Sequence, residues 1–185
     1  MLAYVYWHAA PASTAAADYE KILLRFGHAL AEAKSLGFLG NASYAVGATP
    51  WLGEPGYEDW AWLEGSWALD SLNEHAVSGP MEQPHNAIAQ ATRHGGHGAL
   101  YYLVAGEHEI PGDSKVFWLS RPRGVDWREA MPGIVGSAGA KVSAWRRQTV
   151  LGPSTEFALI ALPGISGLSV PKGWTSIAVE RRRLR

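Results

Sequence analysis

The residues best suited to chemistry lie at the start of the chain. His8 follows Tyr4 and Tyr6 at every second position, so the three side chains share one face of an extended strand. A histidine titrates near neutral pH and, beside phenol groups, can orient a phenolic or quinone-like substrate or accept its proton. The alternative is a strand-end histidine that a backbone carbonyl holds in place.

Asp59 is the second candidate, because it stands among aromatic residues such as Tyr57 and Trp60. A carboxyl group buried among aromatic rings without a partner holds its proton more tightly, as functional acids often do. The alternative is that Asp59 faces solvent, or that it binds a helix N-terminus or an arginine. We therefore take His8, Tyr6 and Asp59 as the candidate catalytic residues.

Further aromatic and polar side chains are candidates for binding a ligand. Aromatic rings suit an apolar or aromatic molecule, and polar residues near the ends of the expected helices would reach a pocket there. The alternatives are that the aromatic rings fill the core and that the polar groups cap the helices. The candidate ligand-binding residues are Tyr4, Trp60, Tyr102, Asn73 and His85.

Histidines also raise the hypothesis of a metal site. His94 and His97 are as close in sequence as metal ligands often are, and His8 or His108 would complete the set. The two glycines between His94 and His97 instead favour an exposed turn, and we predict no metal and no cofactor. The absence of cysteine excludes disulfides and thiolate metal sites.

The elements that must position these residues alternate between strand and helix. Apolar spacings of three and four favour a helix that is capped by Ser13 or Thr14 and runs to Lys34. The first 106 residues then follow the order strand, helix, strand, strand, helix, strand, which is the ferredoxin-like order. Because the strands are apolar on both faces, the far side of their sheet requires a second layer. The expected strands are 2–8, 41–46, 57–63 and 99–105, and the other helices are 66–77 and 86–93.

The rest of the chain predicts that second layer. We interpret residues 114–185 as a degenerate second copy of the half formed by residues 1–106, with its second helix shortened to a turn at 164–168. The expected fold is α+β: two fused ferredoxin-like halves that pack as one structural unit, an α+β barrel-like sandwich, with a junction at 107–113. The second half is expected to contain strands at 114–120, 141–150, 155–162 and 174–180, and a helix at 126–135 capped by Asp126.

In this order of elements the chain resembles the dimeric α+β barrel superfamily, which includes antibiotic-biosynthesis monooxygenase-like and EthD-like proteins and the haem-dependent chlorite dismutases. The resemblance covers residues 1–106 and, less fully, 114–182, and rests on no diagnostic motif. Its members include cofactor-free oxygenases, isomerases, haem enzymes and proteins without known activity, so the fold does not select a function. The haem-binding members carry an axial histidine in the second half. The present chain has no histidine after His108, which argues against haem.

Composition narrows the classes of partner. The 16 basic and 17 acidic residues nearly balance, which excludes a broad positive surface for nucleic acid. We interpret the arginine-rich tail, 180–185, as a solvated terminus. No stretch approaches the ~18 apolar residues of a membrane span, and no secretory signal precedes the first strand. We therefore predict a cytoplasmic protein with no membrane partner.

Together these observations predict a protein that binds a small apolar or aromatic molecule, as a cofactor-free oxygenase or an isomerase. The alternative is a non-catalytic protein whose apolar surface forms a homodimer. A pocket with convergent polar groups favours the first hypothesis. A filled interior with a flat, tryptophan-rich outer patch favours the second.

Overall fold

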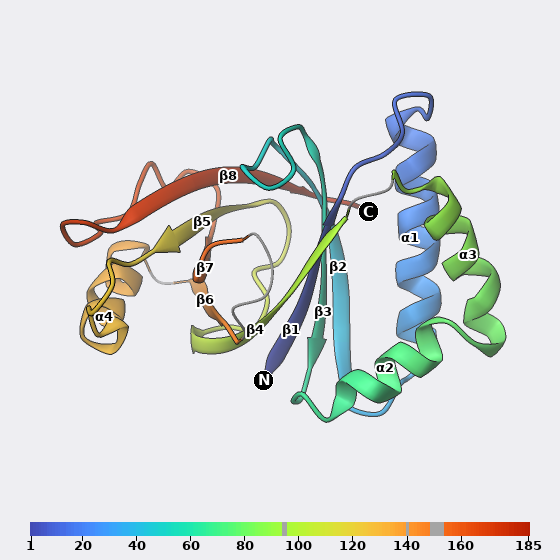
Figure 1. Cartoon of the computed structure of the whole chain (residues 1–185), viewed down its shortest axis with the longest axis horizontal. Helices are drawn as coiled ribbons and strands as arrows, with labels where there is room; N and C mark the ends of the chain where they lie inside the picture. The colour runs from blue at the N-terminus through green and yellow to red at the C-terminus, as the bar shows by residue number, and fades with distance from the viewer. Residues whose placement is uncertain (94–95, 140, 149–153) are drawn as a thin grey trace.

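The computed structural model describes residues 1–93, 96–139, 141–148 and 154–185 (Figure 1). The expected α+β architecture is confirmed, because antiparallel strands close into a barrel and helices pack on its outside. The strands are β1 (Leu2–His8), β2 (Phe38–Val46), β3 (Gly56–Leu63), β4 (His97–Gly106), β5 (Ser114–Ser120), β6 (Val142–Arg147), β7 (Phe157–Ala161) and β8 (Thr175–Arg183). The helices are α1 (Ala16–Glu32), α2 (Ala68–Ala76), α3 (Glu82–Ala91) and α4 (Trp127–Ser137), with a 3-10 turn at Gly79–Met81.

The barrel closes in the strand order β1-β3-β2-β8-β5-β7-β6-β4, and β4 pairs back with β1. Residues before 107 form the first arc, β4-β1-β3-β2, and residues after 113 form the second arc, β8-β5-β7-β6. The arcs meet where β2 pairs with β8 and where β4 pairs with β6. The strands of both arcs follow the same relative order, but residues 162–174 between β7 and β8 form turns and no helix.

Aromatic side chains fill the inside of the barrel. Alternate residues of β3 lie on opposite sides of the barrel wall: Trp60 belongs to the interior cluster, whereas Tyr57 packs with residues of the helices outside. A barrel of eight strands is just wide enough for side chains to fill it. The largest of these fully buried side chains, each at most 1% exposed, are Trp7, Trp60, Trp118, Trp145, Tyr44 and Tyr101.

A charged pair lies inside this apolar barrel. Glu58 of β3 and Arg181 of β8 are 0% and 3% exposed, and Arg181 Nη1 lies 2.7 Å from Glu58 Oε1. The indole nitrogens of Trp7 and Trp60 donate to the Glu58 carboxylate over 2.8 and 2.6 Å. Ser114 Oγ accepts from two guanidinium nitrogens of Arg181. Both carboxylate oxygens are therefore hydrogen-bonded, as a buried charge requires, and the pair joins the two arcs.

Helices α1, α2 and α3 lie on one side of the barrel, and α4 lies on the opposite side (Figure 1). Helix α1 buries Tyr19, Leu23 and Leu30, as spacings of three and four predict. Helix α3 has no fully buried residue. Among the helices of the described residues, none combines the length and the apolar character needed to cross a membrane.

The helix termini partly differ from the predictions. Ser13 and Thr14 do not cap α1, because they belong to a turn before the helix. The N-cap is Ala15, whose side chain has no atom that could accept a hydrogen bond from the first turn. Helix α3 begins earlier than predicted, at Glu82, since the preceding 3-10 turn leads directly into it. The side chain of Asp126 caps α4 as predicted.

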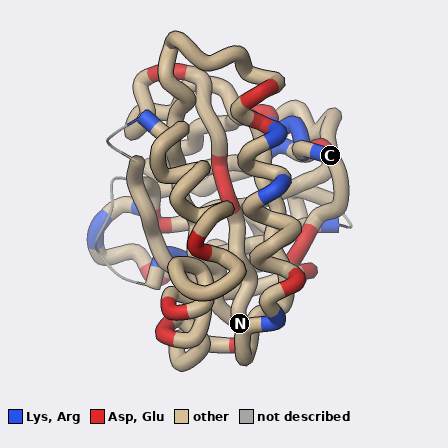
Figure 2. Tube along the Cα trace, turned by 90° about the vertical axis from the view of Figure 1, so that its right-hand side faces the viewer, with Lys and Arg blue, Asp and Glu red and all other residues tan. Residues whose placement is uncertain are grey.

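The helical side of the molecule presents charges of both signs. Acidic residues are spread over this side, and basic residues gather towards the C-terminus (Figure 2). This mixture agrees with the net charge of -1. Over the described residues, this side therefore suits a ligand of low charge better than a polyanion.

Candidate functional site

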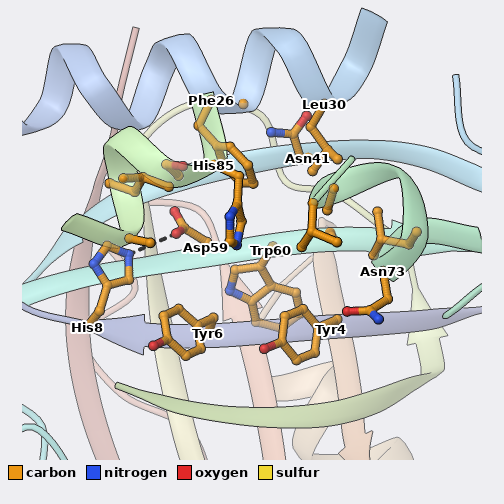
Figure 3. A pocket seen from close by; sticks show the side chains of 18 of the residues that line it. Tyr4, Tyr6, His8, Phe26, Leu30, Asn41, Asp59, Trp60, Asn73 and His85 are labelled. Carbon is orange, nitrogen blue, oxygen red and sulfur yellow. Dashed lines mark hydrogen bonds and ion pairs between the residues drawn. The ribbon is translucent and has the colours of Figure 1, made fainter. Parts of the chain in front are cut away.

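A cavity of about 730 Å³ lies between the outer face of the first arc and the helices α1, α2 and α3. His8 and Asp59 lie at one end of the cavity, and Leu30 and Asn73 lie towards the other (Figure 3). Leu69 and Leu72 add apolar surface from α2. The cavity thus has a polar end on the sheet and a largely apolar remainder, the arrangement typical of small-molecule sites.

The aromatic residues of β1 form one side of the cavity, as their alternation predicts. The rings of Tyr4 and Tyr6 stack with centroids 6.4 Å apart, and those of Tyr6 and His8 with centroids 5.4 Å apart. Glycines on β4 or next to it make room for these rings. A Cβ atom at Gly96 would lie 2.0 Å from the Tyr6 hydroxyl, and one at Gly98 would lie 3.1 Å from the Tyr4 hydroxyl. Gly96, which precedes His97 in the proposed metal motif, therefore leaves space for Tyr6.

His8 is buried and hydrogen-bonded at both ring nitrogens. Its Nε2 lies 2.8 Å from Asp59 Oδ2, and its Nδ1 lies 2.6 Å from the hydroxyl oxygen of Tyr19. The Tyr57 ring stacks on the imidazole at 5.7 Å. Neighbouring strands thus bring His8 and Asp59 together, because residues 8 and 57 are directly paired in the register of β1 and β3.

Asp59 differs from His8 in its exposure. The Asp59 side chain is 29% exposed, whereas that of His8 is 1% exposed. Asp59 Oδ1 is itself buried and has no hydrogen-bond partner among the described residues. As the more exposed side chain of the pair, Asp59 is the one that a molecule in the cavity meets first, and His8 lies behind it.

Tyr19 and Thr92 extend this network, and the sequence analysis did not single them out as site residues. The Tyr19 hydroxyl lies 2.9 Å from Thr92 Oγ1, and the Thr92 hydroxyl donates to the Ile88 carbonyl over 2.8 Å. Tyr19 comes from α1 and Thr92 follows α3. A tyrosine on the buried face of a helix carries a hydroxyl that needs a partner, and this was the only signal for Tyr19 in the sequence.

The lining of the rest of the cavity includes two of the candidate ligand-binding residues and one residue that was not among the candidates. Asn73 and His85 line it as predicted, and the His85 ring lies 6.3 Å from the Phe26 ring. Asn41 of β2 also lines it and was missed. Gly27 of α1 makes room for Asn41, since a Cβ atom there would lie 2.7 Å from the amide nitrogen.

Two predicted ligand-binding side chains lie elsewhere. Trp60 adjoins the cavity, but its indole is 1% exposed and donates to Glu58 inside the barrel. Tyr102 is not among the residues that line the cavity, and its hydroxyl accepts from Arg146 at 2.8 Å. Trp60 points into the barrel because it is next to Asp59 in β3, and successive residues of a strand face opposite sides. Tyr102 lies away from the cavity because the register of β4 and β6 pairs it directly with Arg146.

Burial raises the pKa of the Tyr4, Tyr6 and Tyr19 phenols above the ordinary value of 10.0, and the negative charge of Asp59 adds to this effect. These phenols therefore stay protonated at neutral pH and serve as hydrogen-bond donors. Asp59 and His8 are then the hydrogen-bonded acid–base pair at this end of the cavity.

Over the described residues, the side chains do not form a metal site, and those of the second half do not fit a haem with a histidine ligand. Of the proposed metal ligands, His94 lies outside the described residues, and both ring nitrogens of His8 already have partners. In the part of the chain that the structure describes, no three His, Asp or Glu side chains lie close enough to hold a metal ion. The second half contains no histidine, and its outer face packs against α4 through apolar side chains, so it does not fit a haem with a histidine ligand.

The fold, rather than the sequence, relates the chain to known proteins. No protein-family model and no curated protein matches the sequence. The crystal structure of a provisionally named monooxygenase from Fusobacterium nucleatum aligns with a TM-score of 0.66 at 10% identity, covering 100% of this chain and 92% of that chain. A provisionally named chlorite dismutase aligns at 0.60 and 10% identity, covering 100% and 95%. An anthrone oxidase-like protein aligns at 0.51 and 11% identity, covering 99% and 93%. At these identities the similarity establishes the fold alone, which agrees with the superfamily expected from the order of elements.

Proposed function

We propose that the cavity binds a small aromatic or largely apolar molecule and that the Asp59–His8 pair exchanges a proton with it. The observation behind this proposal is a partly exposed carboxyl group that lines a mostly apolar cavity, has a buried oxygen without a partner and contacts a buried imidazole at 2.8 Å through its other oxygen. Carboxyl and imidazole groups placed in this way are the usual general acids and bases of enzymes.

The chemistry of the walls indicates the kind of molecule. The cavity volume of about 730 Å³ is within the range of small-molecule sites, and the tyrosine rings of β1 offer flat surfaces for an aromatic ring. The apolar surface of Leu30, Leu69 and Leu72 suits a hydrocarbon portion, and Asp59 suits an acidic O–H or C–H hydrogen. A phenol or an aromatic ketone with an acidic CH₂ group has both features.

Two reactions begin with the same step. Asp59 takes the acidic proton, and the electron pair of the broken bond stays on the ligand as a delocalised anion. In an isomerisation the proton returns to another carbon of the same molecule. In a cofactor-free oxygenation the anion transfers its electrons to dioxygen, so that a CH₂ group and O₂ become a carbonyl group and water.

Anthrone is a suitable probe, because it has an acidic CH₂ group between flat rings and one protein of similar fold is anthrone oxidase-like. We expect the protein to accelerate exchange of the CH₂ hydrogens with deuterated solvent under argon, measured by NMR. The variant Asp59→Asn should lose about 100-fold or more of this acceleration. The control Asp18→Asn changes an exposed carboxylate paired with Lys21 and should have no effect.

The outcomes of this experiment separate the possibilities. Oxygen uptake in air by the wild-type protein, lost in Asp59→Asn, would assign oxygenation, and exchange without oxygen uptake would support isomerisation. If anthrone binds, as measured by quenching of tryptophan fluorescence, and the protein does not accelerate exchange, then the proposed acid–base role of Asp59 is wrong.

The alternative function, a homodimer without chemistry, has one observation in its favour. Leu36 and Trp67 are 71% and 55% exposed, and the Trp67 ring lies against Gly37, so apolar side chains gather where α1 connects to β2. Light scattering would test this proposal. A dimer that Trp67→Lys converts to a monomer supports it, and a wild-type monomer at micromolar concentration contradicts it.

We also propose that residues 1–106 and 114–185 are the two halves of a tandem arrangement. The shared strand order of the two arcs supports this interpretation. The missing helix between β7 and β8 is then the main departure of the second half from the first.

A further inference from the structure

The hydrogen bonds behind Asp59 form a chain of four close contacts that ends at a backbone carbonyl. In order, the contacts are Asp59 Oδ2 to His8 Nε2 (2.8 Å), His8 Nδ1 to the Tyr19 hydroxyl (2.6 Å), the Tyr19 hydroxyl to Thr92 Oγ1 (2.9 Å) and Thr92 Oγ1 to the Ile88 carbonyl (2.8 Å). Each of these distances requires a proton between the two atoms. The placement of the protons can therefore be worked out from the closed end.

The carbonyl oxygen of Ile88 can only accept, so the single hydroxyl proton of Thr92 points to it. Thr92 Oγ1 must then accept the proton of the Tyr19 hydroxyl. The Tyr19 oxygen, whose own proton is now used, accepts from His8, so the proton of a neutral His8 ring is on Nδ1. The opposite arrangement, in which Thr92 donates to Tyr19 and Tyr19 donates to His8, leaves two oxygens 2.8 Å apart with no proton between them.

We propose that Thr92 acts through Tyr19 to hold His8 as the Nδ1–H tautomer, so that His8 Nε2 presents a lone pair to Asp59. The proton between Asp59 Oδ2 and His8 Nε2 is then the exchangeable one. Asp59 therefore accepts a proton from a ligand only after this proton has left; a carboxylate then faces the ring lone pair at 2.8 Å, and the ligand's proton restores the hydrogen bond between Asp59 and His8. In the other tautomer the Nε2–H group would donate a hydrogen bond to the Asp59 carboxylate. This bond would stabilise the charged form and make Asp59 a weaker base.

The surroundings support this arrangement. The pKa of the Tyr19 phenol is raised, mainly by burial, so its proton remains available as a donor. The other titratable groups around this end are Tyr4 and Tyr6 from β1, Tyr57 from β3, His85 from α3 and Arg93 after α3. Arg93 Nη1 is paired with Glu54 at 2.6 Å. Thr92 and Tyr19 are therefore positioning residues, whose role in the site is through His8.

The tautomer can be measured without any ligand. Nitrogen-15 NMR of histidine-labelled protein distinguishes Nδ1–H from Nε2–H, and the variant His8→Gln assigns the signals among the seven histidines. We expect neutral His8 to be Nδ1–H in the wild type and in Thr92→Ser, which keeps the hydroxyl. In Thr92→Val the Tyr19 proton is free to turn to His8, so His8 should switch to Nε2–H. Tyr19→Phe should give the same switch.

Two results would overturn the proposal: an Nε2–H tautomer in the wild type, or an unchanged Nδ1–H tautomer in folded Thr92→Val. The wild-type measurement decides even if the valine variant does not fold. The part of Thr92 in proton exchange rests on the proposed function, and there Thr92→Val should slow anthrone exchange about 10- to 100-fold at unchanged anthrone affinity. If the wild type and the variants show the expected His8 tautomers but none accelerates anthrone exchange, the proposed function is wrong and the proposal about the tautomer stands.

Discussion

Replacing Glu58 with glutamine should destabilise the protein strongly, although Glu58 is far from any surface. Glu58 is 0% exposed and accepts hydrogen bonds from Arg181, Trp7 and Trp60 at 2.6 to 2.8 Å. A glutamine of the same shape would turn an amide group towards one of these donors and leave the Arg181 guanidinium without its counter-charge. Breaking a buried ion pair in this way costs about 3–5 kcal/mol.

Urea unfolding followed by tryptophan fluorescence measures this cost. With a slope of about 2 kcal/mol per molar urea, the midpoint for Glu58→Gln should fall by about 1.5–2.5 M. The matched control is Glu180→Gln, whose carboxylate is 67% exposed and paired with Lys115, and it should change the stability by less than about 1 kcal/mol. Combining Glu58→Gln with Arg181→Met should cost less than the sum of the single changes, because the second change removes the unpaired charge.

A midpoint for Glu58→Gln equal to that of Glu180→Gln would refute the reasoning. It would mean that the ion pair inside the barrel is not stabilised by the three donors, or that water reaches it. If the double variant loses as much free energy of unfolding as the two single variants together, then Glu58 and Arg181 do not interact.

Two further predictions concern the tyrosines and glycines near the site. Because burial raises the pKa of Tyr19 and Tyr101 in the folded protein, the unfolded chain loses these protons first. The contribution of these two phenols to the free energy of unfolding should therefore be constant below about pH 10 and fall as the pH rises further. Phenolate absorbance and urea midpoints, measured together at each pH above about 9, test this prediction. Gly96→Ala should displace the Tyr6 ring, since the new Cβ atom would lie 2.0 Å from its hydroxyl, weakening anthrone binding and costing about 1–3 kcal/mol. Gly167→Ala, which meets no atom within 4 Å, is its control, and equal behaviour of the two variants would contradict the packing argument.

Local patterns in the sequence were sufficient for most of the fold. The strand predicted at 114–120 is β5, and Asp126 caps α4 as expected. Alternation along β1 placed Tyr4, Tyr6 and His8 on one face, which is the face that lines the cavity. These predictions succeeded because periodicity and capping act over a few residues and depend little on the rest of the chain.

Contacts between distant segments were the part that the sequence could not reveal. Tyr19 and Thr92 are 73 residues apart, and Glu58 and Arg181 are 123 apart. No local signal distinguishes Arg181 from the other arginines of the C-terminal strand, which was interpreted as a solvated terminus. Only closure of the barrel, by pairing β8 with β2 and β5, turns Arg181 inward and leaves Arg182 outside.

The arrangement of the barrel explains why the site lies outside it. The interior is filled by aromatic side chains and a satisfied ion pair, so the strands that carry His8 and Asp59 are held from behind. The helices above the cavity are held less firmly, since α3 has no fully buried residue and α2 buries only Ala68 and Leu72. In the proposed function, a ligand would displace helices α2 and α3 while Asp59 and His8 keep their positions, as catalysis by preorganised groups requires. A filled barrel interior, taken alone, would favour an interaction protein, but here it supplies the rigid floor of the cavity.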